Sequence, residues 1–322
     1  KRMAPPEDPI LPNFFIAGAP KAGTTSLYHH LRQHPEVFMS PVKEPTYFSF
    51  EARPENFIAE KREWVRGHME NLRASLDGHL EGNRVRGIVE RWEDYVKLFR
   101  NANGQKAIGE ASVFYLWSKT AAPQIAATIP HAKILLILRH PAERAFSQYL
   151  HSLSDGHTSH SFSYSISEGL RNTGELSIYY PFLEFGLYSS QVERFFACFP
   201  REQVRVWLYE DTLAAPAKFL RDVSMFLGID PGFVPDTSRR YFQMEIPRVL
   251  SISQPLRRSR AWRAVREHTP AAIRPLLKRV LYHKPGELKM NPADRRFLID
   301  YYRDDIGKLE RLIERDLSRW LE

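Results

Sequence analysis

A short apolar strand, a glycine-containing loop and a helix follow one another near the start of the chain, and this unit constrains the fold most. Asn13–Ala17 has the composition of a buried parallel strand, and residues 24–33 have that of a helix that ends before Pro35. Between them, Gly18 and Gly23 allow the backbone to turn tightly and approach an anion. The unit therefore predicts an α/β domain with an anion-binding loop at the start of a helix.

The lysine of this loop, Lys21, precedes Gly23 instead of following it directly. A nucleotide hydrolase needs Gly-Lys-Ser/Thr, so that the lysine reaches the β- and γ-phosphates and the hydroxyl binds Mg²⁺. Such an enzyme also needs an acidic residue at the end of a second strand, but the apolar strand 133–138 runs into Arg139. The sequence has a cation where a metal ligand would stand, which disfavours a P-loop kinase or NTPase and leaves it as an alternative.

Two motifs resemble the donor-binding segments of sulfotransferases that use 3′-phosphoadenosine 5′-phosphosulfate (PAPS). Pro20-Lys-Ala-Gly-Thr-Thr-Ser-Leu resembles their 5′-phosphosulfate loop, and residues 139–151 resemble their 3′-phosphate motif, with Arg139 at a strand end and Ser147 in the helix that follows. The likeness extends over most of residues 12–322 and implies a P-loop-like, three-layer α/β fold with a central parallel sheet flanked by helices. It also implies a set of donor-binding residues: Lys21, Ala22, Gly23, Thr24, Thr25, Ser26, Arg139, Ser147, Tyr209 and Lys284.

Arg139 is a phosphate ligand on physical grounds as well. A guanidinium at the carboxyl end of a strand can bind a phosphate bidentately, at the edge where open α/β sheets hold ligands. The alternative is an ion pair with Glu143 on the next helix. Ser147 and Tyr209 rest on the resemblance, because a helical serine often bonds to a backbone carbonyl and a tyrosine is often a core residue.

The chemistry of sulfuryl transfer assigns roles to two further groups. Negative charge develops on the bridging oxygen of the leaving phosphate, so Lys21 and backbone N–H groups can stabilise it without a metal. A neutral acceptor hydroxyl needs a base that removes its proton. Residues 41–48 resemble the Lys-Glu-Pro segment of the glycan-modifying and bacterial branch, in which the glutamate is this base, so the resemblance implies that role for Glu44.

Alternatives to this base stay open. Glu44 could be a solvated glutamate beside Lys43. Related enzymes often carry a histidine at the position of Thr46 and a lysine at that of Ala111, and the departures here put a helper lysine in doubt. Glu110, or a histidine from another segment, is then the fallback base.

Composition agrees with an anionic ligand. The chain has 46 Lys and Arg against 38 Asp and Glu in 322 residues, a net charge of +8 that favours anionic partners such as PAPS. Zinc spacings, aromatic RNA-binding signatures and long basic runs are missing, so no nucleic-acid partner is expected. The single cysteine, Cys198, and the lack of a signal peptide or apolar span predict a cytoplasmic, bacterial protein. The sequence leaves open the oligomeric state and whether an anchor or domain precedes Lys1.

The order of elements predicts how the chain is organised. Residues 1–11 form an extended lead-in to one domain over residues 12–322, in which residues 50–90 are a candidate lid or acceptor-site insertion. Strands at 133–138 and 204–209 alternate with helices, which is typical of a parallel sheet. Apolar residues at helical spacing predict a C-terminal amphipathic helix held by Trp320. These residues are Leu298, Tyr302, Ile306, Leu309 and Ile313.

The interpretation is a PAPS-dependent sulfotransferase that moves a sulfuryl group to a hydroxyl or amine, on a carbohydrate or glycolipid, and releases adenosine 3′,5′-bisphosphate (PAP) without a metal. A carrier-bound hydroxyacyl chain or a small phenol is an alternative acceptor. A non-catalytic anion-binding module is the alternative outside enzymes. The acceptor assignment is an analogy, because fold and donor site do not specify the acceptor.

Overall fold

A central parallel sheet organises the molecule. The computed structural model describes residues 9–57, 59–76, 85–171, 181–237, 246, 283 and 287–322. Five strands pair in the order β2-β5-β1-β6-β7, and every pairing is parallel. They are β1 (Phe14–Gly18), β2 (Val37–Met39), β5 (Ala107–Ala111), β6 (Lys133–Leu138) and β7 (Val204–Leu208). The predicted strands at 13–17, 133–138 and 204–209 are confirmed with small shifts at their ends.

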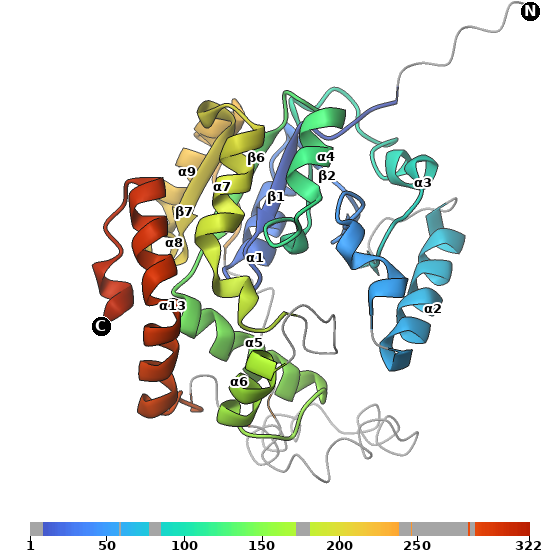
Figure 1. Cartoon of the computed structure of the whole chain (residues 1–322). Helices are drawn as coiled ribbons and strands as arrows, with labels where there is room; N and C mark the ends of the chain where they lie inside the picture. The colour runs from blue at the N-terminus through green and yellow to red at the C-terminus, as the bar shows by residue number, and fades with distance from the viewer. Residues whose placement is uncertain are drawn as a thin grey trace, which may run out of the picture.

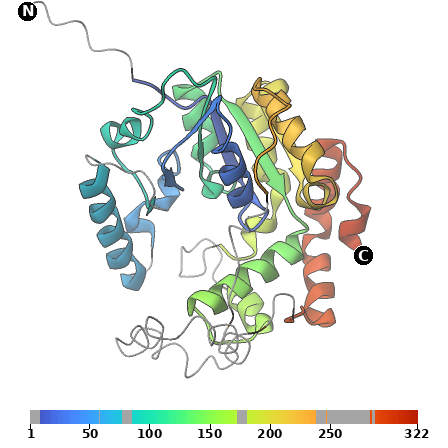
Figure 2. The same cartoon turned by 180° about the vertical axis from the view of Figure 1, so that it is seen from behind.

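Helices cover both faces of this sheet (Figures 1 and 2). On one face lie α4 (Ala121–Thr128), α7 (Tyr188–Cys198) and α13 (Pro292–Ile313), and on the other α1 (Thr24–Leu31) and α9 (Pro216–Leu227). Strands that are covered on both sides read as continuous apolar runs, as in Lys133-Ile-Leu-Leu-Ile-Leu. The expected three-layer α/β fold is confirmed.

The remaining elements surround the sheet. Beyond the carboxyl ends of the strands lie α5 (Pro141–Asp155) and α6 (Phe162–Arg171), and α8 (Tyr209–Ala214) directly follows β7 (Figure 1). To one side lie α2 (Ala59–Leu76) and α3 (Trp92–Lys97), with a two-stranded parallel sheet of β3 (Val42–Lys43) and β4 (Val85–Arg86). The short 3₁₀ helices are Phe50–Ala52, Pro54–Asn56, Val113–Tyr115, Glu184–Gly186, Arg201–Gln203 and Ser318–Leu321.

The predicted C-terminal helix packs as its apolar spacing requires. All five of the predicted apolar residues of α13 are buried, and the hydroxyl of Tyr302 donates a hydrogen bond to the Leu183 carbonyl at 2.8 Å. Trp320 is buried against the rings of His140 and Tyr188, so it holds the chain end onto the body as predicted. Within the described ranges, every helix is too short or too polar to cross a lipid bilayer.

Candidate active site

One cavity of about 500 Å³ gathers most of the predicted site residues at the carboxyl edge of the sheet. Predicted residues that line it are Lys21, Gly23, Thr24, Thr25, Ser26, Glu44, Arg139, Ser147 and Tyr209. Ala22 is fully buried and is not among the lining residues. Lys284 lies outside the described residues. The two sequence motifs, which are more than a hundred residues apart in the chain, therefore meet in one cavity.

The loop between β1 and α1 has the geometry of an anion-binding turn. Gly23 is the N-cap of α1 with φ of 85°, in the left-handed region that favours glycine. No described side chain caps this helix and its first turn has no acidic residue, so its first N–H groups are available to an anion. A Cβ on Gly23 would lie 2.9 Å from the Tyr209 ring, so glycine also allows that ring to approach the loop.

Substitution of Gly23 should therefore weaken anion binding. In Gly23→Ala, the left-handed backbone of the loop costs about 1–2 kcal/mol, and the new Cβ displaces the Tyr209 ring. The affinity for PAP, measured by titration calorimetry, should therefore fall about tenfold or more. Gly104→Ala is the matched control, because Gly104 has φ of 75° but no atom within 4 Å of the added Cβ. An equal loss of affinity in both variants would contradict the assignment of this loop.

Arg139 joins the two motifs physically. Its Nη1 donates a hydrogen bond to the backbone carbonyl of Lys21 at 3.0 Å, and its guanidinium lies 4.9 Å from the centroid of the Tyr209 ring. The alternative partner, Glu143, instead lies 3.7 Å from the Nε of Arg295. The Tyr188 hydroxyl donates to the carbonyl of Arg139 at 2.9 Å, which fixes its backbone. Arg139 is thus held between the loop and Tyr209, facing the cavity.

His140, which the sequence did not single out, begins α5 beside this arginine. Its Nδ1 accepts a hydrogen bond from the Ala142 backbone N–H at 3.2 Å, so the imidazole caps the helix. Burial, together with the charges of Arg295 and Arg139, lowers the pKa of His140 to about 4. The ring is neutral at pH 7, so the positive charge at this end of the cavity comes from arginine and lysine.

Glu44 and Lys21, the two predicted catalytic residues, both adopt left-handed backbone conformations, with φ of 66° and 65°. Such conformations cost about 1–3 kcal/mol each in residues other than glycine and persist where surrounding contacts impose them. The Glu44 N–H donates to the Ala111 carbonyl at 2.9 Å, and Lys43 Nζ lies 2.7 Å from Glu44 Oε1. The Lys43 side chain is only 9% exposed, whereas that of Glu44 is 29% exposed and borders the cavity.

Glu110, the fallback base, lies elsewhere. It is fully buried on β5, is not among the residues that line the cavity, and accepts hydrogen bonds from three hydroxyl groups. Burial raises the pKa of Glu110 to about 7. Glu110 therefore lies outside the cavity, whereas Glu44 is the one carboxylate among the described residues that line it.

The sequence did not identify the other residues that line the cavity, among them His151. His151 lies on α5 with its Nδ1 3.5 Å from Asp155 Oδ2. The apolar wall combines side chains of α5 with residues distant from it in sequence, so no local pattern could reveal it as a whole. It consists of Val113, Phe114, Phe146, Leu150 and Phe185.

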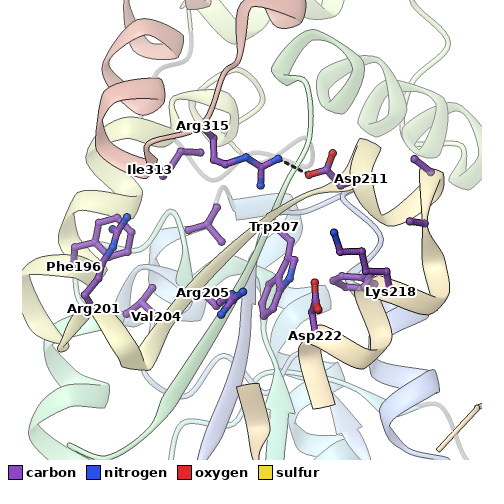
Figure 3. Close-up of a pocket in the computed structure, with 14 residues that line it drawn as sticks. Phe196, Arg201, Val204, Arg205, Trp207, Asp211, Lys218, Asp222, Ile313 and Arg315 are labelled. Carbon is purple, nitrogen blue, oxygen red and sulfur yellow. Dashed lines mark hydrogen bonds and ion pairs between the residues drawn. The ribbon is translucent and has the colours of Figure 1, made fainter. Parts of the chain in front are cut away.

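A second cavity of about 700 Å³ lies along the outer side of β7 and shares no residue with the first (Figure 3). Its charged groups are partly satisfied within the protein, since Arg315 Nη2 lies 2.6 Å from Asp211 Oδ2 and the Arg201 guanidinium stacks 3.6 Å from the Phe196 ring centroid. None of the predicted site residues contributes to it.

Comparison with known proteins gives the family of the chain. Residues 12–233 match the model of the sulfotransferase family. A crystal structure of a sulfotransferase from Alicyclobacillus acidocaldarius is 31% identical, with a TM-score of 0.71 over 97% of this chain and 100% of that chain.

Curated relatives are similar over parts of their length. Carbohydrate sulfotransferase 15 of Rattus norvegicus is 28% identical over 69% of this chain and 44% of its own length. The human bifunctional heparan sulfate N-deacetylase/N-sulfotransferase 3 is 29% identical over 69% of this chain and 23% of its own length. The chain thus spans less than half of these relatives. The family match across most of the chain, together with the near-complete structural match, establishes that the chain belongs to the sulfotransferase family.

Proposed function

We propose that this sulfotransferase takes its sulfuryl group from PAPS, transfers it to a hydroxyl or amine of a carbohydrate or glycolipid, and releases PAP. The observation that carries the proposal is the hydrogen bond between Arg139 and the Lys21 carbonyl within one cavity. It joins a loop suited to a 5′-phosphosulfate with a cation suited to a 3′-phosphate, as a bisphosphorylated nucleotide requires.

The donor is held by charge and by backbone dipoles. The N–H groups at the start of α1, with the hydroxyls of Thr24 and Thr25, receive the 5′-phosphosulfate. Arg139 and Ser147 receive the 3′-phosphate, and Tyr209 contacts the adenine. Because these groups supply positive charge at both anionic ends, we propose that transfer needs no metal.

Transfer then requires one bond exchange and one proton movement. The acceptor oxygen or nitrogen attacks sulfur while the bond from sulfur to the bridging oxygen of the donor breaks. Lys21 stabilises the negative charge that develops on that bridging oxygen. Glu44 takes the proton of the acceptor group, and PAP leaves with the electron pair of the broken sulfur–oxygen bond. The product is a sulfate ester or a sulfamate.

A glycan acceptor is supported by the names of the relatives, which include a carbohydrate sulfotransferase and a heparan sulfate N-sulfotransferase. A hydroxyacyl chain or a phenol would use the same donor site and the same base. We also propose a bacterial cytoplasmic protein, which is supported by the single cysteine and by the similarity to a bacterial sulfotransferase.

The test is PAP binding and sulfuryl transfer with and without Mg²⁺. PAP affinity by titration calorimetry should be the same in Mg²⁺ and in EDTA, and labelled PAPS should pass its sulfate to at least one member of a panel of glycans, phenols and hydroxyacyl thioesters. Binding of ATP that depends on Mg²⁺, in place of PAP binding, would instead indicate a P-loop kinase or NTPase. PAP binding without transfer to any acceptor would indicate an anion-binding module.

A further inference from the structure

A fully buried carboxylate lies beneath the segment that carries the proposed base. Glu110, near the carboxyl end of β5, accepts hydrogen bonds at Oε1 from the hydroxyls of Tyr95 at 2.9 Å and Tyr115 at 2.8 Å. Its Oε2 accepts one from the Ser112 hydroxyl at 2.8 Å. Burial of a carboxylate is unfavourable unless hydrogen bonds compensate for the lost water, and here three hydroxyl groups supply those bonds.

Two of the three hydroxyls continue to the backbone of residues 44–48. The Ser112 hydroxyl accepts a hydrogen bond from the Thr46 N–H at 3.1 Å, and the Tyr115 hydroxyl accepts one from the Phe48 N–H at 3.4 Å. Thr46, like Glu44, has a left-handed backbone, with φ of 50°. The network therefore contacts residues 44–48, the segment that has a strained backbone and carries Glu44 at the edge of the cavity.

We propose that Glu110 is a positioning residue, which acts through Ser112 and Tyr115 to hold residues 44–48 in the conformation that directs Glu44 at the acceptor. This inference rests on the proposed function, in which Glu44 is the base.

The chemistry of the network explains why the residue must be a carboxylate. Above its pKa of about 7, the Glu110 carboxylate is ionised and only accepts hydrogen bonds, so each neighbouring hydroxyl directs its single proton to Glu110. The lone pairs of Ser112 and Tyr115 are then directed to accept from the N–H groups of Thr46 and Phe48. A glutamine would present an NH₂ group to one side of the network. A hydroxyl that accepts from this NH₂ group must turn its own proton toward a backbone N–H of residues 44–48, and the two donors then face each other.

The decisive variant is Glu110→Gln, which keeps the size of the side chain and reverses part of this hydrogen-bond direction. Because misplacement of a catalytic group by about 1 Å can cost about 100-fold, we expect kcat to fall about 10- to 100-fold when it is measured above pH 7, where Glu110 is ionised. The affinity for PAP should be unchanged, since the proposed donor loop and Arg139 are on other segments than the network. Unchanged kcat, or a parallel loss of PAP affinity and kcat, would overturn the inference.

Tyr95→Phe is the matched control. The Tyr95 hydroxyl donates to Glu110, but no hydrogen bond is seen from it to residues 44–48 in the described structure, and its ring stacks on Tyr47 at 4.6 Å. The variant removes one bond to the carboxylate and keeps the ring, so kcat should change little. A loss as large as that of Glu110→Gln would show that the network supports folding in general and would contradict a specific positioning role.

Amide hydrogen exchange tests the same inference without an acceptor. In Glu110→Gln, the N–H groups of Thr46 and Phe48 should exchange faster, with the amides of α1 unaffected. If Glu110→Gln does not fold, Tyr115→Phe should speed exchange at Phe48 alone. Unchanged exchange at both amides would overturn the inference, even if the chain transferred no sulfate. Faster exchange in the variant, together with a wild-type protein that transfers no sulfate, would count against the proposed function only.

The pH dependence of stability gives a separate readout of the carboxylate. Because burial raises the pKa of Glu110 from 4.5 to about 7, the folded state binds more protons than the unfolded state between these values. The free energy of unfolding should therefore decrease as pH rises from 4.5 to 7, and this contribution should be missing in Glu110→Gln. The facing groups, Tyr95 and Tyr115, have pKa values raised well above 10 by burial, so they stay neutral in this range.

Discussion

Glu44→Gln should lower kcat by about 10²- to 10⁴-fold, because glutamine keeps the shape of the side chain but cannot take the proton of the acceptor. PAP affinity should not change, since the proposed donor ligands, Lys21 and Arg139, are on other segments. Single-turnover rates with saturating PAPS would measure the chemical step directly. The variant also leaves the buried Lys43 ammonium without its carboxylate at 2.7 Å, so some loss of thermal stability is expected.

Glu143→Gln provides the control for this experiment. Glu143 is on α5 near the same edge of the sheet but is not among the residues that line the cavity, and it forms a partly exposed ion pair with Arg295. Such pairs contribute about 0–1 kcal/mol, so activity and stability should be close to those of the wild type. Full activity in Glu44→Gln would exclude Glu44 as the base.

Arg139→Ala should weaken PAP binding by at least about 100-fold, because hydrogen bonds to charged groups contribute about 1.5–3 kcal/mol and a bidentate phosphate contact makes two of them. The loss should be specific for the 3′-phosphate. Adenosine 5′-monophosphate, which lacks that group, should lose much less affinity than PAP in the same variant. Arg139→Lys should recover only part of the affinity, since lysine keeps the charge but not the planar fork of donors.

Arg205→Ala is the control for a general effect of charge. Arg205 is on the neighbouring strand β7 and lines the second cavity, away from the proposed donor site. Its removal lowers the net charge by the same amount and should leave PAP affinity nearly unchanged at physiological salt. Equal losses for PAP and adenosine 5′-monophosphate in Arg139→Ala would contradict its assignment to the 3′-phosphate.

The part of the site that sequence could predict follows from local patterns and one rule of topology. Gly23 and Lys21 lie in a strand-loop-helix unit that is legible within twenty residues. Arg139 follows a second apolar strand, and neighbouring parallel strands end at the same edge of the sheet, so its meeting with the loop was predictable.

What sequence missed depends on contacts between distant segments. Strand β5 was not predicted, because Gly109 and Glu110 interrupt the apolar run of its five residues. A Cβ on Gly109 would lie 2.2 Å from the Phe14 ring. Without β5, the burial of Glu110 could not be foreseen. Helix α2 was also missed within residues 50–90, although its apolar residues recur at helical spacing: Val65, Met69, Leu72 and Leu76. Its many charged residues obscured that pattern, and its role as a lid stays a prediction.

The position of β7 as the outermost strand of the described sheet has a consequence for how copies of this protein behave in a crowded solution. An open strand edge presents unpaired peptide groups that can template the addition of another chain. Here exposed Arg201, Arg205 and Lys218 flank that edge. Charged side chains along an edge strand disfavour pairing with another chain, so these residues oppose aggregation at the β7 edge of the described sheet.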